Sequence, residues 1–235
     1  GKIKVPGFLP DTPECRAEIA QYHQSCSRID QGLGHLVGLL KESRQWDNTV
    51  LIYTADHGMA FPGGKTTVYE AGLRVPFVVR HPHARKTGVV NNAMISHVDI
   101  TPSILDLAGA YDENRRAPRQ LTEVPRVPPG ENAGKPVKAY HGRSWVPILE
   151  AINPEGWDEI GASHTFHEIQ MYYPMRVVRD RRYKLIWNIA WRQPYPFASD
   201  LWAASTWQAQ YAKGPKARYG NRTVDSYINR PRFEL

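Results

Sequence analysis

The densest group of chemically capable side chains follows a β-rich run, in the segment Thr54-Ala-Asp56-His57-Gly58. A glycine-rich stretch comes next and ends at Lys65. Carboxylate oxygen suits hard divalent cations and imidazole is a general metal ligand, so Asp56 and His57 could bind one metal ion together. Lys65 could hold an anionic group that the same metal touches. The alternative interpretation is a turn after a strand, with Asp56 capping a backbone N–H group and Lys65 solvated.

The glycine-rich stretch does not match a phosphate-binding P-loop. That motif requires a glycine six residues before the lysine, and the residue at that position is Met59. Pro62 also lies within the stretch. The sequence therefore excludes a P-loop and leaves the metal-and-anion interpretation open.

The elements that must position these residues indicate an α/β protein. Apolar residues recur at helical spacing through residues 12–42, with Thr12 as the expected cap. Residues 49–55 form a continuous β-rich run, which is typical of a strand buried on both faces of a parallel sheet. A second strand is expected at 75–80 and a second helix at 101–108. Helices alternating with buried strands predict a layered α/β architecture.

The character of the sequence changes twice toward the C-terminal end. Residues 112–138 are rich in Pro, Arg and Gly without periodicity, which predicts a long surface loop or linker. Residues 183–191 alternate imperfectly and are rich in aromatic residues, as is typical of an antiparallel strand. We therefore expect two parts, residues 1–170 and a smaller C-terminal subdomain, residues 171–235, with an antiparallel sheet.

The charge balance narrows the class of partner. The 235 residues include 30 Lys and Arg against 23 Asp and Glu, a formal net charge of +7, which indicates an anionic partner without identifying it. Residues 176–192 are strongly basic and contain Trp187 and Trp191, a pattern compatible with nucleic-acid binding or with a solvated strand face. No apolar run approaches 18 residues, so no membrane span is expected. Two cysteines exclude a disulfide-dense scaffold.

An ordered series of blocks resembles the second half of a sulfatase, a family of the alkaline-phosphatase-like superfamily. The blocks are residues 47–58, Lys65, residues 69–76 and residues 96–109. Further on, residues 166–176, 182–188 and 194–197 resemble the heparan N-sulfatase (N-sulfoglucosamine sulfohydrolase) branch. The resemblance implies the C-terminal part of an alkaline-phosphatase-like mixed or parallel sheet sandwiched by helices, residues 1–170 being the second half of the catalytic domain.

The resemblance also implies roles for individual residues. Asp56 matches the family's metal-binding Asp, and His57 takes the second position, which is Asn in most members. The implied cofactor is a divalent metal, with Ca²⁺ favoured, and Lys65 matches a basic catalytic residue that contacts the sulfate. The family's nucleophile is a formylglycine made from Cys in a C-x-P-S-R motif, which neither Cys15 nor Cys26 fits. We therefore expect the formylglycine in a missing N-terminal part, and residues 1–235 alone to be inactive.

A second polar cluster, His164, His167 and Glu168, lies between apolar segments. Under the resemblance these are expected substrate-binding residues that recognise a sugar, whereas the alternative is surface histidines. A sulfated carbohydrate then becomes the expected partner, in place of nucleic acid or a membrane, and a homodimer is compatible with the family. The resemblance places the protein outside the cytoplasm, in a periplasmic, secreted or lysosomal location.

The function implied is hydrolysis of a sulfuric ester or sulfamate on a sulfated sugar or glycosaminoglycan. The nearest alternative is a phosphodiester or phosphonate hydrolase of the same superfamily. An alternative of another class is a non-catalytic module that binds polyanions.

Overall fold

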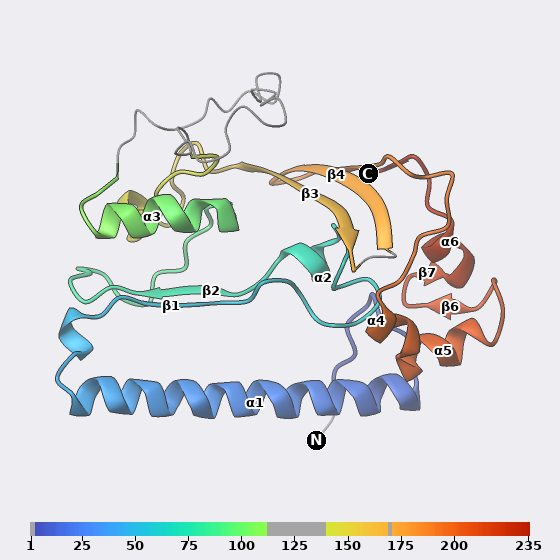
Figure 1. Ribbon diagram of the computed structural model, residues 1–235, viewed down its shortest axis with the longest axis horizontal. Helices are drawn as coiled ribbons and strands as arrows, with labels where there is room; N and C mark the ends of the chain where they lie inside the picture. The colour runs from blue at the N-terminus through green and yellow to red at the C-terminus, as the bar shows by residue number, and fades with distance from the viewer. Residues whose placement is uncertain (1–2, 112–139, 169–170) are drawn as a thin grey trace. The chain divides into compact units, whose positions relative to one another are not determined.

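The computed structural model describes residues 3–111, 140–168 and 171–235 (Figure 1). The chain divides into two compact units, one made of Gly1–His83 with Gly161–Leu235 and the other of Ala84–Ile160. Helices and strands occur together in the chain, which confirms a mixed α/β architecture. The predicted loop at residues 112–138 lies outside the described residues.

The first unit begins with the predicted long helix, α1, Pro13–Glu42. The Thr12 hydroxyl accepts a hydrogen bond from the Cys15 N–H at 3.3 Å, and Pro13 takes the first helical position. A capping side chain and a proline there both stabilise a helix start, because the first N–H groups have no partner within the helix. Only Cys15 and Ile19 of this helix are buried.

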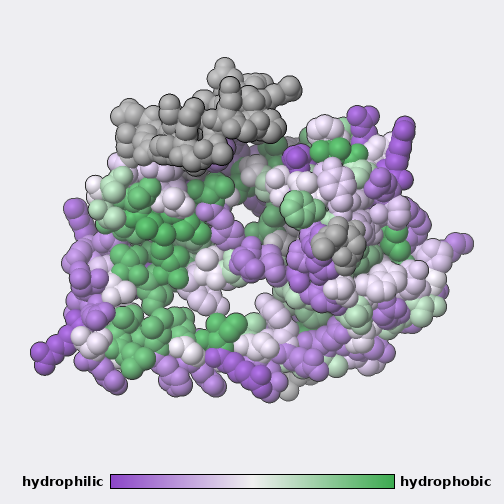
Figure 2. Space-filling model, in the orientation of Figure 1, coloured by the Kyte–Doolittle hydropathy of each residue, from purple (hydrophilic) through white to green (hydrophobic). Residues whose placement is uncertain are grey.

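The apolar stripe of α1 is fully buried only near the start of the helix. Near its start α1 contacts α5, Ser205–Tyr211, and the Glu18 carboxylate accepts hydrogen bonds from the Ser205 N–H and hydroxyl at 2.7 and 2.6 Å. Hydrophobic side chains gather over the C-terminal half of α1 in Figure 2. Ile29, Leu36 and Leu39 are exposed there. The amphipathic pattern thus predicted the helix correctly, but within the described residues its stripe is fully buried only near the start of the helix.

This difference gives a stability prediction. Ile19 is 1% exposed and Leu39 is 62% exposed. Ile19→Ala is expected to lower the free energy of unfolding by about 2–5 kcal/mol, because it removes buried methyl groups and leaves a cavity. Leu39→Ala on the same helix is expected to change it by about 0.5 kcal/mol or less. Urea unfolding followed by tryptophan fluorescence measures both, and equal losses would contradict the difference in burial between Ile19 and Leu39.

A short 3₁₀ helix, η1, Trp46–Asn48, leads into strand β1, Leu51–Thr54, which pairs with β2, Phe77–Arg80. The pairing is antiparallel, with Leu51 opposite Arg80, and every β1 residue is half-buried. The expectation of a parallel strand buried on both faces is therefore wrong for this pair. A parallel partner needs a crossover of a dozen or more residues, usually an α-helix. The connection here contains only the four-residue helix α2, Glu70–Leu73, and the chain returns in the opposite direction.

The C-terminal part builds a four-stranded sheet in the order β3-β4-β5-β8. Its strands are β3, Glu159–His167; β4, Met171–Asp180; β5, Lys184–Asn188; and β8, Phe233–Glu234. Strand β5 pairs antiparallel with β4 and β8, which confirms the antiparallel strand expected at 183–191. Figure 1 shows β3 beside β4, so the predicted boundary at residue 170 falls between neighbouring strands. The division into residues 1–170 and 171–235 stays a prediction.

An aromatic core packs between the remaining C-terminal elements of the first unit. Around it lie α4, Ser199–Ala203; α5; α6, Val224–Ile228; and the hairpin of β6, Arg218–Tyr219, with β7, Arg222–Thr223. The side chains of Trp207, Tyr219 and Tyr227 are buried and in ring contact with one another. Leu201 of α4 is buried in this core, so the core holds the helix that carries Ser199 and Asp200.

The second unit contains α3, Ile100–Leu107, which confirms the helix expected at 101–108, and the 3₁₀ helices η2, His97–Asp99, and η4, Val146–Ile148. The Asp99 carboxylate accepts hydrogen bonds from the backbone N–H groups of Ser96 and Arg143, both at 2.8 Å. Asp99 therefore has a structural role. No helix in the described part of the chain combines the length and apolar character needed to cross a membrane.

Candidate functional site

Asp56 and His57 lie together in the loop that follows β1. The His57 backbone N–H donates to Asp56 Oδ1 at 3.0 Å, and His57 Nε2 lies 3.6 Å from Asp56 Oδ2. His57 Nδ1 is 2.8 Å from the Gly58 carbonyl oxygen. A carbonyl can only accept, so Nδ1 carries the proton of the neutral ring and Nε2 keeps a free lone pair. Oδ2 and Nε2 can therefore each give a lone pair to a metal ion, and neither is engaged in a hydrogen bond within the described residues.

Glycines fix the backbone of this loop against α2. The Gly58 N–H donates to the Gly72 carbonyl at 2.9 Å. A Cβ on Gly58 would lie 1.6 Å from the Ala71 carbonyl oxygen, and one on Gly72 would lie 2.4 Å from the Gly64 carbonyl oxygen. Only glycine permits such close backbone approach. The Asp-His-Gly order therefore places two potential ligands on a rigid loop.

The pair fits part of a metal site. Oxygen and nitrogen ligands bind divalent cations at about 2.0–2.6 Å, so two donors 3.6 Å apart can reach one ion. The Asp56 side chain is 88% exposed, which leaves its outer oxygen accessible. Across residues 3–111, 140–168 and 171–235, no group of three or more His, Cys, Asp or Glu side chains could hold a metal. Asp56 and His57 thus supply two donors, and the described chain does not complete the coordination.

Lys65 is held by an acid that the sequence did not reveal. Lys65 Nζ lies 2.6 Å from Asp200 Oδ2, and the Lys65 side chain is 17% exposed. Partial burial opposes ionisation of Asp200, but the hydrogen bond and charge of Lys65 outweigh it and lower the pKa of that carboxyl. Asp200 lies in the first turn of α4, 135 residues further along the chain. No local pattern could have predicted this contact.

The second predicted cluster meets the same helix. The Glu168 carboxylate accepts hydrogen bonds from the Ser199 hydroxyl at 3.2 Å and the Ser199 N–H at 3.4 Å. His167 Nε2 lies 3.8 Å from Glu168 Oε1. Ser199 and Asp200 are adjacent, so the start of α4 ties Lys65 and Glu168 to one place.

The predicted site residues do not all contact one another. The His164 ring nitrogen Nδ1 lies 3.4 Å from the Tyr173 carbonyl oxygen within the β3–β4 pair. No hydrogen bond or ion pair in the described part of the chain links Lys65 with Asp56 or His57. The predicted roles of these side chains stay predictions.

The burial of His164 predicts a pH-dependent stability. Burial lowers the pKa of this imidazole, an effect that the Tyr173 hydrogen bond opposes. The unfolded chain, with a pKa of about 6.5, therefore binds the proton first as pH falls. The stability from the neutral ring is present above that pH and is lost as pH falls through the folded pKa. His164→Gln should flatten the decline in unfolding free energy between about pH 7 and 5.

Urea unfolding over a pH series measures this slope. His35→Gln, on the exposed surface of α1, is the matched control and should leave the slope unchanged. A wild-type slope in His164→Gln would contradict the assignment of the titration to His164.

Comparison with known proteins adds to this geometry. Residues 4–110, which contain Asp56, His57 and Lys65, match the family model described as Sulfatase. Across 240 aligned residues the chain is 33% identical to human (Homo sapiens) N-sulphoglucosamine sulphohydrolase, covering 99% of this chain and 44% of that protein.

Two further relatives cover smaller parts of the chain. An N-acetylglucosamine-6-O-sulfatase of Bacteroides thetaiotaomicron is 29% identical, covering 67% of this chain and 25% of its own length. A putative extracellular sulfatase Sulf-1 homolog of Caenorhabditis elegans is 37% identical over 43% of this chain and 15% of its own length. The chain thus spans less than half the length of these relatives. The matched segment and the relatives agree, and the chain belongs to the sulfatase family.

Proposed function

We propose that the protein hydrolyses sulfuric esters or sulfamates on a sulfated sugar, with a sulfated amino sugar or glycosaminoglycan as the substrate class. The observation that carries the proposal is the family match over residues 4–110, because that segment includes Asp56, His57 and the half-buried Lys65. Two relatives support the substrate class, since their names specify sulfated glucosamine derivatives. The chain covers only 44% and 25% of these two relatives, so the activity of the whole protein is part of the proposal.

Lys65 would contact the sulfate. Its ammonium group has three N–H donors, and Asp200 is its one partner in the described residues, so two donors remain for sulfate oxygens. The Asp200 carboxylate fixes the direction of the lysine side chain and balances its charge in the absence of substrate. As a sulfate bond breaks, negative charge grows on the oxygens, and a positioned cation stabilises it by several kcal/mol.

Asp56 and His57 would hold a divalent cation, and calcium is the ion we propose. A bound cation supplies further positive charge to the sulfate oxygens. Asp56 Oδ2 and His57 Nε2 are the atoms positioned for it, 3.6 Å apart. The glycine contacts of the loop keep both donors in place.

Glu168, His167 and His164 would recognise the sugar, and both histidines belong to β3. Glu168 sits at a positive φ of 56°, in the left-handed region that non-glycine residues rarely adopt. Its carboxylate is turned toward Ser199 at the start of α4, the helix that also carries the partner of Lys65. We propose an extracytoplasmic location, which the relative named extracellular supports. A homodimer remains a prediction.

The test is product analysis with the full-length protein. Incubation with N-sulfoglucosamine, glucosamine-6-sulfate and an aryl phosphodiester should release inorganic sulfate from at least one sugar and phosphate products from none at a comparable rate. Faster phosphodiester cleavage would favour the hydrolase alternative. Metal-independent heparin binding without any hydrolysis would favour the polyanion-binding module.

A further inference from the structure

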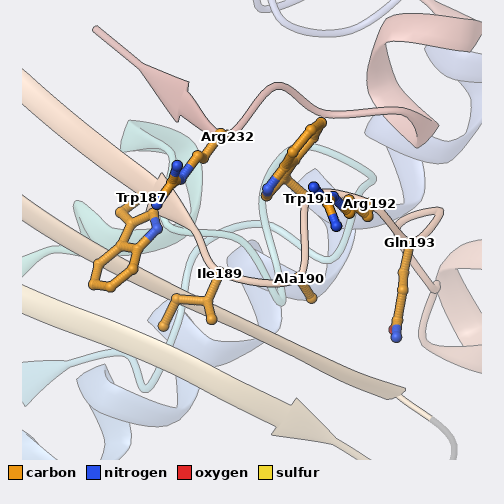
Figure 3. A pocket seen from close by; sticks show the side chains of 7 residues that line it. All are labelled: Trp187, Ile189, Ala190, Trp191, Arg192, Gln193 and Arg232. Atoms are coloured by element: carbon orange, nitrogen blue, oxygen red, sulfur yellow. The ribbon is translucent and has the colours of Figure 1, made fainter.

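A pocket of about 440 Å³ opens where the chain leaves β5 (Figure 3). None of its residues belongs to the candidate site. The lining residues come from the end of β5, the turn after it, and the approach to β8: Trp187, Ile189, Ala190, Trp191, Arg192, Gln193 and Arg232. This volume falls in the range of small-molecule sites, about 300–1,000 Å³.

Backbone hydrogen bonds hold the pocket walls. The Ile189 N–H donates to the Pro174 carbonyl at 3.0 Å, and the Gln193 N–H donates to the Ala190 carbonyl at 2.8 Å. The Asn188 N–H donates to the Arg232 carbonyl at 2.9 Å, which joins the two sides. The pocket is therefore formed without a ligand, and binding would not have to order the turn.

Two indole rings give the pocket flat apolar surface. Trp187 is 41% exposed and Trp191 is 39% exposed. The ring of Trp187 stacks on Phe233 with centroids 6.4 Å apart, which fixes it from one side. Exposed aromatic side chains that gather in one pocket are typical of binding surfaces, because a ligand can cover apolar area that is otherwise left in contact with water.

Two arginines add positive charge to the same walls. The Arg192 guanidinium lies 5.3 Å from the Trp191 ring centroid, and that of Arg232 lies 5.2 Å from the Phe233 ring centroid. Neither forms an ion pair with a carboxylate in the described part of the chain. Guanidinium groups match the planar geometry of anionic oxygen groups and can donate two hydrogen bonds at once. Both arginines thus remain available to an anion.

Two neighbouring basic residues do not add to this charge. Arg179 and Lys184 both pair with Glu70, at 3.0 and 2.9 Å. A nucleic-acid groove would need cations continuing along a strand. The two arginines of the pocket lie beside two indoles, which suits a short anionic ligand with flat apolar faces.

We propose that this pocket binds a sulfated saccharide, as a second sugar-binding site built from Trp187, Trp191, Arg192 and Arg232. The inference rests on the proposed function for the class of sugar. The indoles would pack against the faces of sugar rings, and the arginines would bind sulfate groups. A polymeric substrate would then be held at this pocket in addition to the catalytic site.

The test measures binding of a size-defined heparin hexasaccharide by calorimetry. It uses the full-length protein carrying Lys65→Ala, with a chelator present, so that the candidate active site contributes little. The Arg192→Gln/Arg232→Gln double variant should bind at least about tenfold more weakly, with a smaller dependence on salt. Trp191→Ala should also weaken binding. Arg28→Gln on α1 and Trp202→Ala are the matched controls for charge and exposed indole, and should bind as before.

The outcomes separate this site from the proposed function. Unchanged hexasaccharide affinity in the double variant would overturn the pocket, even if the wild type releases sulfate. Loss of affinity in the pocket variants, in a protein that hydrolyses no sulfated substrate, would support the pocket and reject the proposed function. Equal or tighter binding of single-stranded DNA through the same four residues would overturn the saccharide assignment. With Lys65 intact, the pocket variants should turn over a sulfated monosaccharide at the wild-type rate.

Discussion

Asp56→Ala is expected to lower the turnover of a sulfated sugar by about 10²–10³-fold in the full-length protein. The substitution removes the carboxylate that lies 3.6 Å from His57 Nε2 and leaves one donor where two are positioned. Steady-state release of inorganic sulfate, with metal in excess, measures the effect. The loss should be in kcat, because the cation that the pair would hold stabilises negative charge that grows as the bond breaks.

Asp47→Ala is the matched control for this prediction. Asp47 is another exposed acid, in η1 just before β1, with its side chain 98% exposed and 3.8 Å from Arg80. Its removal should change turnover less than about twofold, since surface ion pairs contribute little. Wild-type turnover in Asp56→Ala would contradict the metal-site assignment.

Arg230→Ala is expected to lower the free energy of unfolding by about 3–5 kcal/mol. The Arg230 side chain is buried at 2% exposure, and its guanidinium lies 3.4 Å from the Tyr195 ring centroid. Its Nε also donates to the Tyr227 carbonyl oxygen at 3.2 Å. Removing it leaves a cavity among aromatic rings and an acceptor without its partner. Chemical unfolding of the full-length protein measures the loss.

Two further variants test separately the charge of Arg230 and its buried position. Arg230→Met keeps most of the volume but removes the charge, so it should recover part of the loss if packing dominates. Arg232→Ala removes an exposed arginine two positions along the chain and should cost about 0.5 kcal/mol or less. An equal cost for Arg230→Ala and Arg232→Ala would contradict the buried position of Arg230.

What the sequence predicted correctly depends on neighbours along the chain. Thr12 and Pro13 mark the start of α1 because a cap acts within one turn. The adjacency of Asp56 and His57 is likewise local, so their pairing in one loop followed from the sequence alone. The antiparallel strand β5 was predicted from its alternating aromatic pattern.

What the sequence could not predict depends on contacts between distant segments. The antiparallel pairing of β1 with β2 is set by the path of the connection, which single-strand patterns do not encode. The ion pair of Lys65 with Asp200 spans 135 residues and brings the lysine to the helix that also contacts Glu168. The burial of α1 is a third case, because an amphipathic stripe shows which face is apolar but not what covers it.

The most direct test of the central claim compares sulfate release by the full-length wild type and by Lys65→Ala, with N-sulfoglucosamine and glucosamine-6-sulfate as substrates. If Lys65 contacts the sulfate, the wild type releases inorganic sulfate and Lys65→Ala loses about 10²-fold or more in kcat/KM. Equal rates of sulfate release by the two proteins, or no release from either substrate by the wild type, would contradict it.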